Sequence, residues 1–163
     1  LKDSGKIRMS GVSVWNPDEV EACLSHGSFD VLQVNFNALR QENLPGIRKV
    51  AAAGIGIIVN QPLAAGMLTG KYTKDSTFPE SDHRGGFWTD EMFDAHAAKL
   101  KTVSYAVKPP FESSAQVAVA FVLAMPEVTS TIAGAKRPSQ IEQTAAASDM
   151  TLPKEVVDEL IDS

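Results

Sequence analysis

Hydrophobic residues gather in four short runs along the chain, and each run ends in a polar or glycine-rich turn before a segment with helical spacing. Short apolar runs bounded by turns predict strands, and strands that alternate with helix-sized connections predict parallel β/α units. The four runs are Ile7–Val14, Phe29–Phe36, Gly54–Val59 and Val128–Ala133. Parallel units that close into a barrel gather functional residues at the carboxyl ends of their strands. We therefore expect a site in the segments that follow these runs.

Helix signals follow the predicted strands. Asn16-Pro17-Asp18-Glu19 predicts a helix start, because Asn caps helices, Pro suits the first helical position and acids favour the first turn. Gly27 is predicted to end this helix. Further helices are expected over 44–53, 91–106, 113–124, from about 138 onward and over 153–161. The long polar segment Tyr72–Trp88 is typical of an active-site flap or a disordered loop.

Length and charge limit the possible functions. The 163 residues are enough for one domain with a core, but a complete (β/α)8 barrel needs roughly 250. The net charge is −5, and the scattered basic residues form no stripe, which argues against a nucleic-acid partner. No apolar stretch approaches the ~20 residues of a membrane helix, and no signal-peptide pattern opens the chain. We expect neither nucleic acid nor membrane as a partner.

Cysteine and histidine give no metal site or nucleophile. Cys23 is the only cysteine, which excludes an internal disulfide and agrees with a reducing, cytoplasmic setting. No His/Cys/Asp/Glu set has metal-ligand spacing, and no Gly-x-Ser-x-Gly motif is present. We therefore predict no metal ligand and no catalytic residue in this chain. The first residues, Leu1 to Gly5, read as the tail of a helix stopped by glycine, and we expect the chain to be part of something larger.

The last strand-to-helix turn carries the clearest candidate chemistry. Gly134 permits close backbone approach, Lys136 and Arg137 add positive charge, and a helix starts near Pro138. Helix N-termini favour anions, so this combination predicts a phosphate site. The alternative is a glycine turn with two solvated basic side chains.

Two other strand ends carry weaker signals. The turn from Pro62 to Gly66 offers backbone amides to a pyrophosphate, or is a tight turn of small residues packed under a helix. Ser13 and Gln33 are short polar groups that can hydrogen-bond an amide or a carbonyl, or serve only the structure.

Taken in order, these segments resemble the aldo-keto reductase family over nearly the whole chain. The resemblance implies an α/β fold, the (β/α)8 TIM barrel, of which residues 1–163 supply only the C-terminal four β/α units, a half barrel. The segments that carry it are Gly5–Ser13, Phe29–Gln33 with Phe36-Asn37, Gly54–Lys71, Ser114–Leu123 and Ile132–Glu142, which resemble the fifth to eighth strands with their loops and helices.

The family implies reduction of aldehydes and ketones by hydride transfer from NADP(H), without a metal. Ser13 and Gln33 would then hold the nicotinamide carboxamide, with Asn60 beneath the nicotinamide ring. Leu63 and Gly66 would line the pyrophosphate path. The remaining cofactor contacts implied by the resemblance are Gly134, Lys136, Arg137 and Gln140 at the 2′-phosphate end and Gln143 and Thr144 near adenine. The loop Tyr72–Trp88 would border the pocket of a small carbonyl substrate.

The sequence also departs from the family pattern. Val14 stands where many members have Asn, Asn60 replaces an aromatic residue or arginine, and Gln143-Thr144 replaces Glu-Asn. The family's Asp, Tyr, Lys and His tetrad lies on four strands that this chain lacks, so we predict that the chain alone is inactive. NADPH against NADH stays open.

The expected partner is the missing N-terminal half barrel or a second copy, because a half barrel leaves two sheet edges unpaired. The alternative reading is a non-catalytic half barrel that binds a nucleotide or a protein.

Overall fold

The chain folds around one parallel four-stranded sheet. A computed structural model describes residues 1–82, 84 and 88–162. The strands are β1 (Gly11–Val14), β2 (Val31–Asn35), β3 (Gly56–Asn60) and β4 (Ser130–Ile132), and they lie side by side in chain order. All three pairings are parallel, which confirms the predicted α/β class and all four strands.

Each strand is shorter than its apolar run. The backbone N–H of Ser10, for example, donates to the Asp30 carboxylate at 2.7 Å, so this group is held by a side chain just before the β1–β2 ladder begins. Lys2 also pairs with Asp30, and this hydrogen bond, with that of Ser10, lowers the pKa of the carboxyl group.

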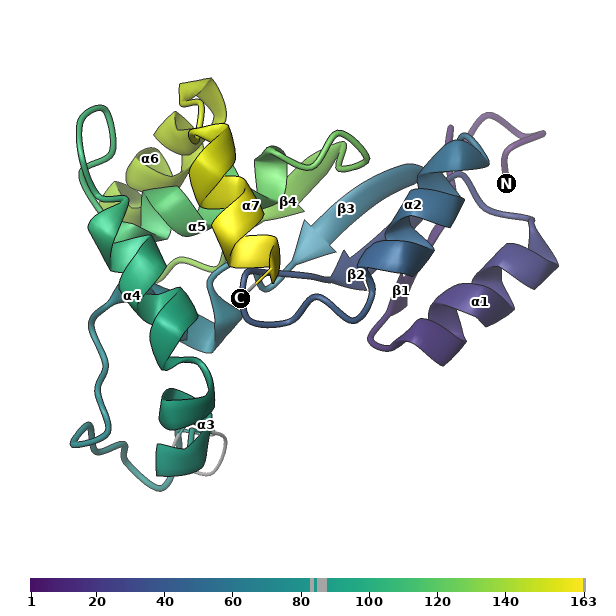
Figure 1. The fold of residues 1–163 in the computed structure, drawn as a ribbon. Coiled ribbons are helices and arrows are strands. Elements are labelled where there is room, and N and C mark those ends of the chain that lie inside the picture. The colour runs from purple at the N-terminus through teal and green to yellow at the C-terminus, as the bar shows by residue number, and fades with distance from the viewer. Residues whose placement is uncertain (83, 85–87, 163) are drawn as a thin grey trace.

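Helices fill the connections (Figure 1). Helices α1 and α2 lie beside β1–β3, whereas α4–α7 gather at the other end of the molecule. Asn16 Oδ1 accepts from the Glu19 N–H at 3.0 Å and Gly27 takes a left-handed φ of 59°, so both predicted ends of the first helix are confirmed. The described helices are α1 (Pro17–His26), α2 (Leu44–Ala52), α3 (Asp90–Ala95), α4 (Ala97–Tyr105), α5 (Ser114–Leu123), α6 (Pro138–Ala146) and α7 (Lys154–Asp162), with the 3₁₀ segments η1 (Ala64–Thr69) and η3 (Ala147–Asp149).

The single helix predicted over 91–106 is wrong, because two helices meet at His96. His96 leaves helical geometry with φ −107° and ψ 7°. The break serves two packing clusters: Phe93 on α3 packs with Met67 and Trp88, whereas Val103 on α4 enters the main core. A straight helix would have to serve both clusters with one apolar face.

Alternate residues of the strands face two different environments. Leu32, Val34, Ile57 and Val59 are fully buried in the main core. The other face, which includes Ser13 and Gln33, is not fully buried. The open four-stranded sheet therefore leaves the face with Ser13 and Gln33 accessible to solvent.

The sheet has two open edges in the described structure, since β1 and β4 each pair with one strand. Large apolar side chains stand exposed near both: Val12 and Trp15 at β1, and Ile132 on β4. Among the described helices, none has the length and apolar character needed to cross a bilayer.

Candidate functional site

Ser13, near the carboxyl end of β1, and Gln33, in the middle of β2, come together. They are register partners in the sheet, and Gln33 Nε2 donates to Ser13 Oγ at 2.7 Å. Both retain solvent access, so the pair can open to a ligand amide. Val14 is only 3% exposed and belongs to the main core, so this position offers no polar contact.

Asn60 ends β3 beside Asn35 of β2, its register partner. Both are buried, and Asn60 Oδ1 and both polar atoms of the Asn35 side chain find no hydrogen-bond partner among the described residues. An unsatisfied buried polar group costs about 1–3 kcal/mol. The unsatisfied polar atoms of Asn35 and Asn60 therefore lower the stability of the fold at this position. Buried polar groups without partners are often found at functional sites.

The turn after β3 has an unusual backbone. Gln61, Ala64 and Ala65 have φ of 53°, 48° and 54°, in the left-handed region that non-glycine residues rarely adopt, and Gly66 has φ 101°. Residues with strained backbone angles of this kind concentrate at ligand sites. Successive backbone N–H groups in a turn can also form a concavity that binds anions. The rings of Tyr72 and Trp88 lie against Gly66, where a Cβ would come within 3.4 and 3.5 Å of them.

A cavity of about 740 Å³ joins this turn to the turn after β4. This volume lies within the usual range of small-molecule sites. Among the predicted cofactor residues it is lined by Leu63, Gly66, Gly134, Lys136 and Gln140. Ser13, Gln33, Asn60, Arg137, Gln143 and Thr144 do not line it.

The start of α6 is organised by Gln140. Its Oε1 accepts from the N–H groups of Lys136 at 2.8 Å and Arg137 at 3.1 Å. These N–H groups are therefore already occupied, and an anion at this turn would meet the side chains of Lys136 and Arg137, which are both exposed. Further along α6, Thr144 Oγ1 donates to the Gln140 carbonyl at 2.8 Å and Gln143 is partly buried.

The cavity lining also includes residues that the sequence analysis did not select as cofactor contacts, among them Lys71, Tyr72, Asp82 and Arg84. Arg84 donates to Tyr72 Oη and, through Nε, to Asp82 Oδ1, both at 2.8 Å. The Arg84 hydrogen bonds hold the pKa of Asp82 far below its ordinary value, and the same bonds raise the pKa of Arg84. The sequence signal for Tyr72, Asp82 and Arg84 was the long loop Tyr72–Trp88, whereas Lys71 ends the segment Gly54–Lys71. Neighbouring His83 lies outside the described residues.

The charge of the cavity suits an anion. Its described charged lining comprises Lys71, Arg84 and Lys136 against one carboxylate, Asp82, which Arg84 neutralises. The salt bridges among the described residues include neither Lys71 nor Lys136, although the positive charge of Lys136 also helps to lower the pKa of Asp82. Two cations thus remain available to a phosphate-bearing ligand.

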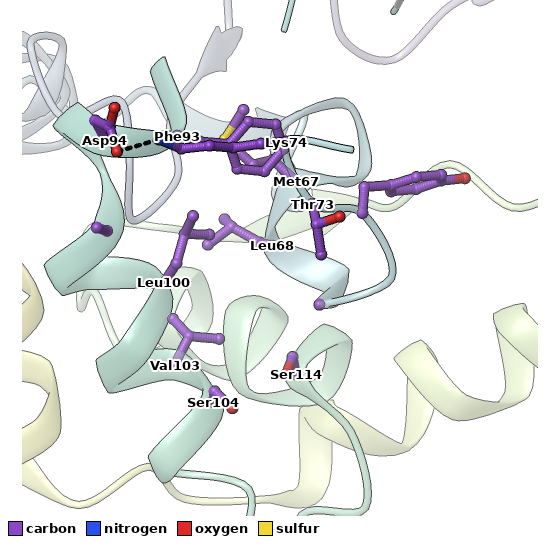
Figure 2. A pocket seen from close by; sticks show the side chains of 13 residues that line it. Met67, Leu68, Thr73, Lys74, Phe93, Asp94, Leu100, Val103, Ser104 and Ser114 are labelled. Carbon is purple, nitrogen blue, oxygen red and sulfur yellow. Dashed lines mark hydrogen bonds and ion pairs between the residues drawn. The ribbon is translucent and has the colours of Figure 1, made fainter. Parts of the chain in front are cut away.

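A second cavity, of about 290 Å³, lies between η1, α3, α4 and α5. Figure 2 shows Met67, Leu68, Leu100 and Val103 along it, the Lys74–Asp94 ion pair at one end and Ser104 and Ser114 at the other. Among the described residues that line it, only this ion pair is charged, so no cation comparable to Lys71 or Lys136 is found there. Over residues 1–82, 84 and 88–162, no group of three or more His, Cys, Asp and Glu side chains could hold a metal.

Comparison with known proteins identifies the family, since the model of the aldo/keto reductase family matches residues 1–162. The chain belongs to the aldo/keto reductase family. This aldo/keto reductase chain is similar to the NADH-specific methylglyoxal reductase of Escherichia coli K12, with 28% identity over 98% of the chain and 52% of that protein. It is also similar to the probable voltage-gated potassium channel subunit beta of Oryza sativa subsp. japonica, with 32% identity over 97% of the chain and 52% of that protein.

Solved structures support the same assignment. The glycerol dehydrogenase of Gluconobacter oxydans superposes with a TM-score of 0.77 and 25% identity, over 99% of this chain and 51% of the enzyme. This aldo/keto reductase chain therefore spans about half the length of the relatives it matches.

Proposed function

We propose that this chain is the C-terminal half of the barrel of an NADPH-dependent aldo-keto reductase and carries most of its cofactor site. The observation that supports this most strongly is the cavity between the turns after β3 and β4, where a strained backbone turn faces Lys71 and Lys136. Close backbone approach and positive charge both favour a phosphate-bearing ligand.

Each group along the cofactor would meet residues of this chain. Ser13 and Gln33 would hold the nicotinamide carboxamide, with Asn60 beneath the ring, and the turn with Leu63 and Gly66 would follow the pyrophosphate. The bound nicotinamide supplies the hydride that reduces a small aldehyde or ketone. Lys136 and Arg137, set by Gln140, would face the 2′-phosphate, and Gln143 and Thr144 would lie near adenine.

The proton donor for the carbonyl oxygen would come from outside this chain. The family resemblance assigns it to an Asp/Tyr/Lys/His tetrad on the first four strands of the barrel, and we infer that the chain alone does not reduce carbonyl compounds. The open edges of β1 and β4 support closure by an N-terminal half barrel or by a second copy. We infer a cytoplasmic setting, which the single free thiol of Cys23 supports.

Titration calorimetry with NADPH and NADH on the purified chain tests the cofactor assignment. We expect NADPH to bind more tightly and Lys136→Ala to weaken NADPH roughly tenfold, because a hydrogen bond to a charged group contributes about 1.5–3 kcal/mol. NADH affinity should change little, since NADH has no 2′-phosphate.

Lys74→Ala is the matched control, because Lys74 lies outside this cavity and pairs with Asp94. Absence of nucleotide binding by the wild-type chain would contradict the proposal. Equal affinity for both nucleotides, unchanged by Lys136→Ala, would remove the NADPH preference and agree with the NADH-specific relative.

A non-catalytic half barrel that binds a nucleotide or a protein is the second candidate. The similarity to a plant protein named as a probable potassium channel subunit beta favours it. The two candidates differ in whether the completed barrel reduces carbonyl compounds.

A further inference from the structure

Asn43 occupies the N-cap position of α2 but does not cap this helix. Its φ of −84° and ψ of −9° are helical, and its side chain makes no capping hydrogen bond. Asn16, at the same position of α1, does cap its helix. The buried Asn43 side chain is therefore used for something else.

The Asn43 amide joins the ends of two neighbouring strands. Its Nδ2 donates to the carbonyl of Trp15 at 3.1 Å and to that of Asn35 at 2.9 Å. The register pairs of β1 and β2 end at Val14 and Val34, one residue earlier on each strand. The Asn43 side chain thus links β1 and β2 just beyond the last residues that pair between these strands.

Ser13 and Gln33 lie two residues before these carbonyls on β1 and β2. The distance between their side chains, 2.7 Å from Nε2 to Oγ, depends on the relative position of the two strand ends. A carboxamide held by both groups needs them fixed to within a fraction of an ångström, because hydrogen bonds weaken quickly with distance and angle. Asn43 is the side chain that bridges the two ends at this point.

The arrangement weakens the local fold in two ways. The first turn of α2 goes without a side-chain cap, and Asn43 Oδ1 is buried without a hydrogen-bond partner among the described residues. Capping needs an extended backbone at this position, so the helical backbone of Asn43 goes with a side chain that bonds to the two strand ends instead.

We propose that Asn43 is a positioning residue that fixes Ser13 and Gln33 for the nicotinamide carboxamide. The inference rests on the proposed function, because it assigns a support to one end of the same cofactor site. Asn43 itself touches no ligand: it acts through the backbone of Trp15 and Asn35.

Gln41 supplies a matched control two residues earlier. Its Nε2 also donates to two backbone carbonyls, those of Ala38 at 2.8 Å and Leu160 at 2.6 Å. The chemistry is the same, but Gln41 ties its loop to α7 rather than tying β1 to β2. Gln41→Met and Asn43→Leu each replace a bridging amide side chain by an apolar side chain of similar size.

The experiment measures binding of NADPH and of adenosine 2′,5′-bisphosphate, which has no nicotinamide, by calorimetry. We expect Asn43→Leu to weaken NADPH at least tenfold and to leave the bisphosphate within twofold of wild type. Gln41→Met should leave the affinities for both ligands within twofold. Asn43→Ser is the second variant, because serine keeps a small polar side chain but is too short to bridge both carbonyls.

Asn43→Ser should remain folded, as its thermal melting curve will show, and lose NADPH affinity selectively. If it binds both nucleotides as the wild type does, or loses both in parallel, Asn43 has no positioning role. A wild-type chain that binds the bisphosphate but not NADPH would also overturn this inference, while the adenine end of the proposed site would stand. Failure of the wild-type chain to bind either nucleotide would overturn the proposed function together with this inference.

Discussion

Asn35 and Asn37 lie two positions apart near the end of β2 and are equally inaccessible to solvent, but they differ in hydrogen bonding. Asn37 donates to the Gln61 carbonyl and accepts from two backbone N–H groups, each at 3.0 Å. Neither side-chain polar atom of Asn35 has a partner among the described residues. Asn37 therefore stabilises the fold, whereas Asn35 destabilises it.

Substitution of these two residues by leucine should have opposite effects. Asn35→Leu removes unsatisfied groups and should raise the free energy of unfolding by about 1–3 kcal/mol, whereas Asn37→Leu should lower it by a similar amount or more. Urea denaturation measures both. A loss of stability in Asn35→Leu would show that its amide is satisfied in solution, for example by an ordered water.

At the scale of elements, the junction of α3 and α4 contains a titratable group. Partial burial lowers the pKa of His96 from its ordinary value of 6.5, and the positive charges of Lys99 and Arg40 lower it further. The folded chain therefore binds this proton less readily than the unfolded chain does.

This difference predicts acid sensitivity with a defined sign. Above the unfolded pKa of 6.5 the stability contribution of neutral His96 is complete, and it is lost as the pH falls from 6.5 through the lower folded pKa. The melting temperature of His96→Gln should therefore fall less than that of wild type across this window. His26→Gln, at the exposed end of α1, is the matched histidine variant for comparison. Superimposable profiles for all three proteins would contradict the assignment.

At the scale of the molecule, we expect the chain to self-associate in solution, because its sheet has open edges. The edges at β1 and β4 present unpaired backbone next to exposed Val12, Trp15 and Ile132. We expect sedimentation of the purified chain to show self-association, and Trp15→Lys with Ile132→Lys to reduce it, because edge lysines oppose strand pairing. A chain that is monomeric at all accessible concentrations would contradict this expectation.

We also expect no NADPH-dependent turnover by the chain alone. Turnover by the purified chain would contradict this second expectation.

The sequence predicted features that depend on near neighbours in the chain. The Asn16 cap, the Gly27 stop and the four strands are such features, because caps and apolar runs act over a few residues. The break at His96 was not predictable, since it serves two clusters built from distant segments. The same holds within the candidate site: the contact of Arg84 with Tyr72 and the Asn43 bridge join segments that local patterns do not relate.

The chain order of the strands has a consequence for how the molecule folds. Residues bonded between β1 and β2 are 20 positions apart, as in Ser13 and Gln33, whereas those between β3 and β4 are 72 apart, as in Val59 and Thr131. Loop closure costs about 0.6 kcal/mol more for each doubling of length, and distant contacts form late. We expect β4 to dock last, during or after synthesis of the chain. Because β4 leads into the turn with Gly134 and Lys136, the cavity proposed to bind the nucleotide would be the final part of the fold to assemble.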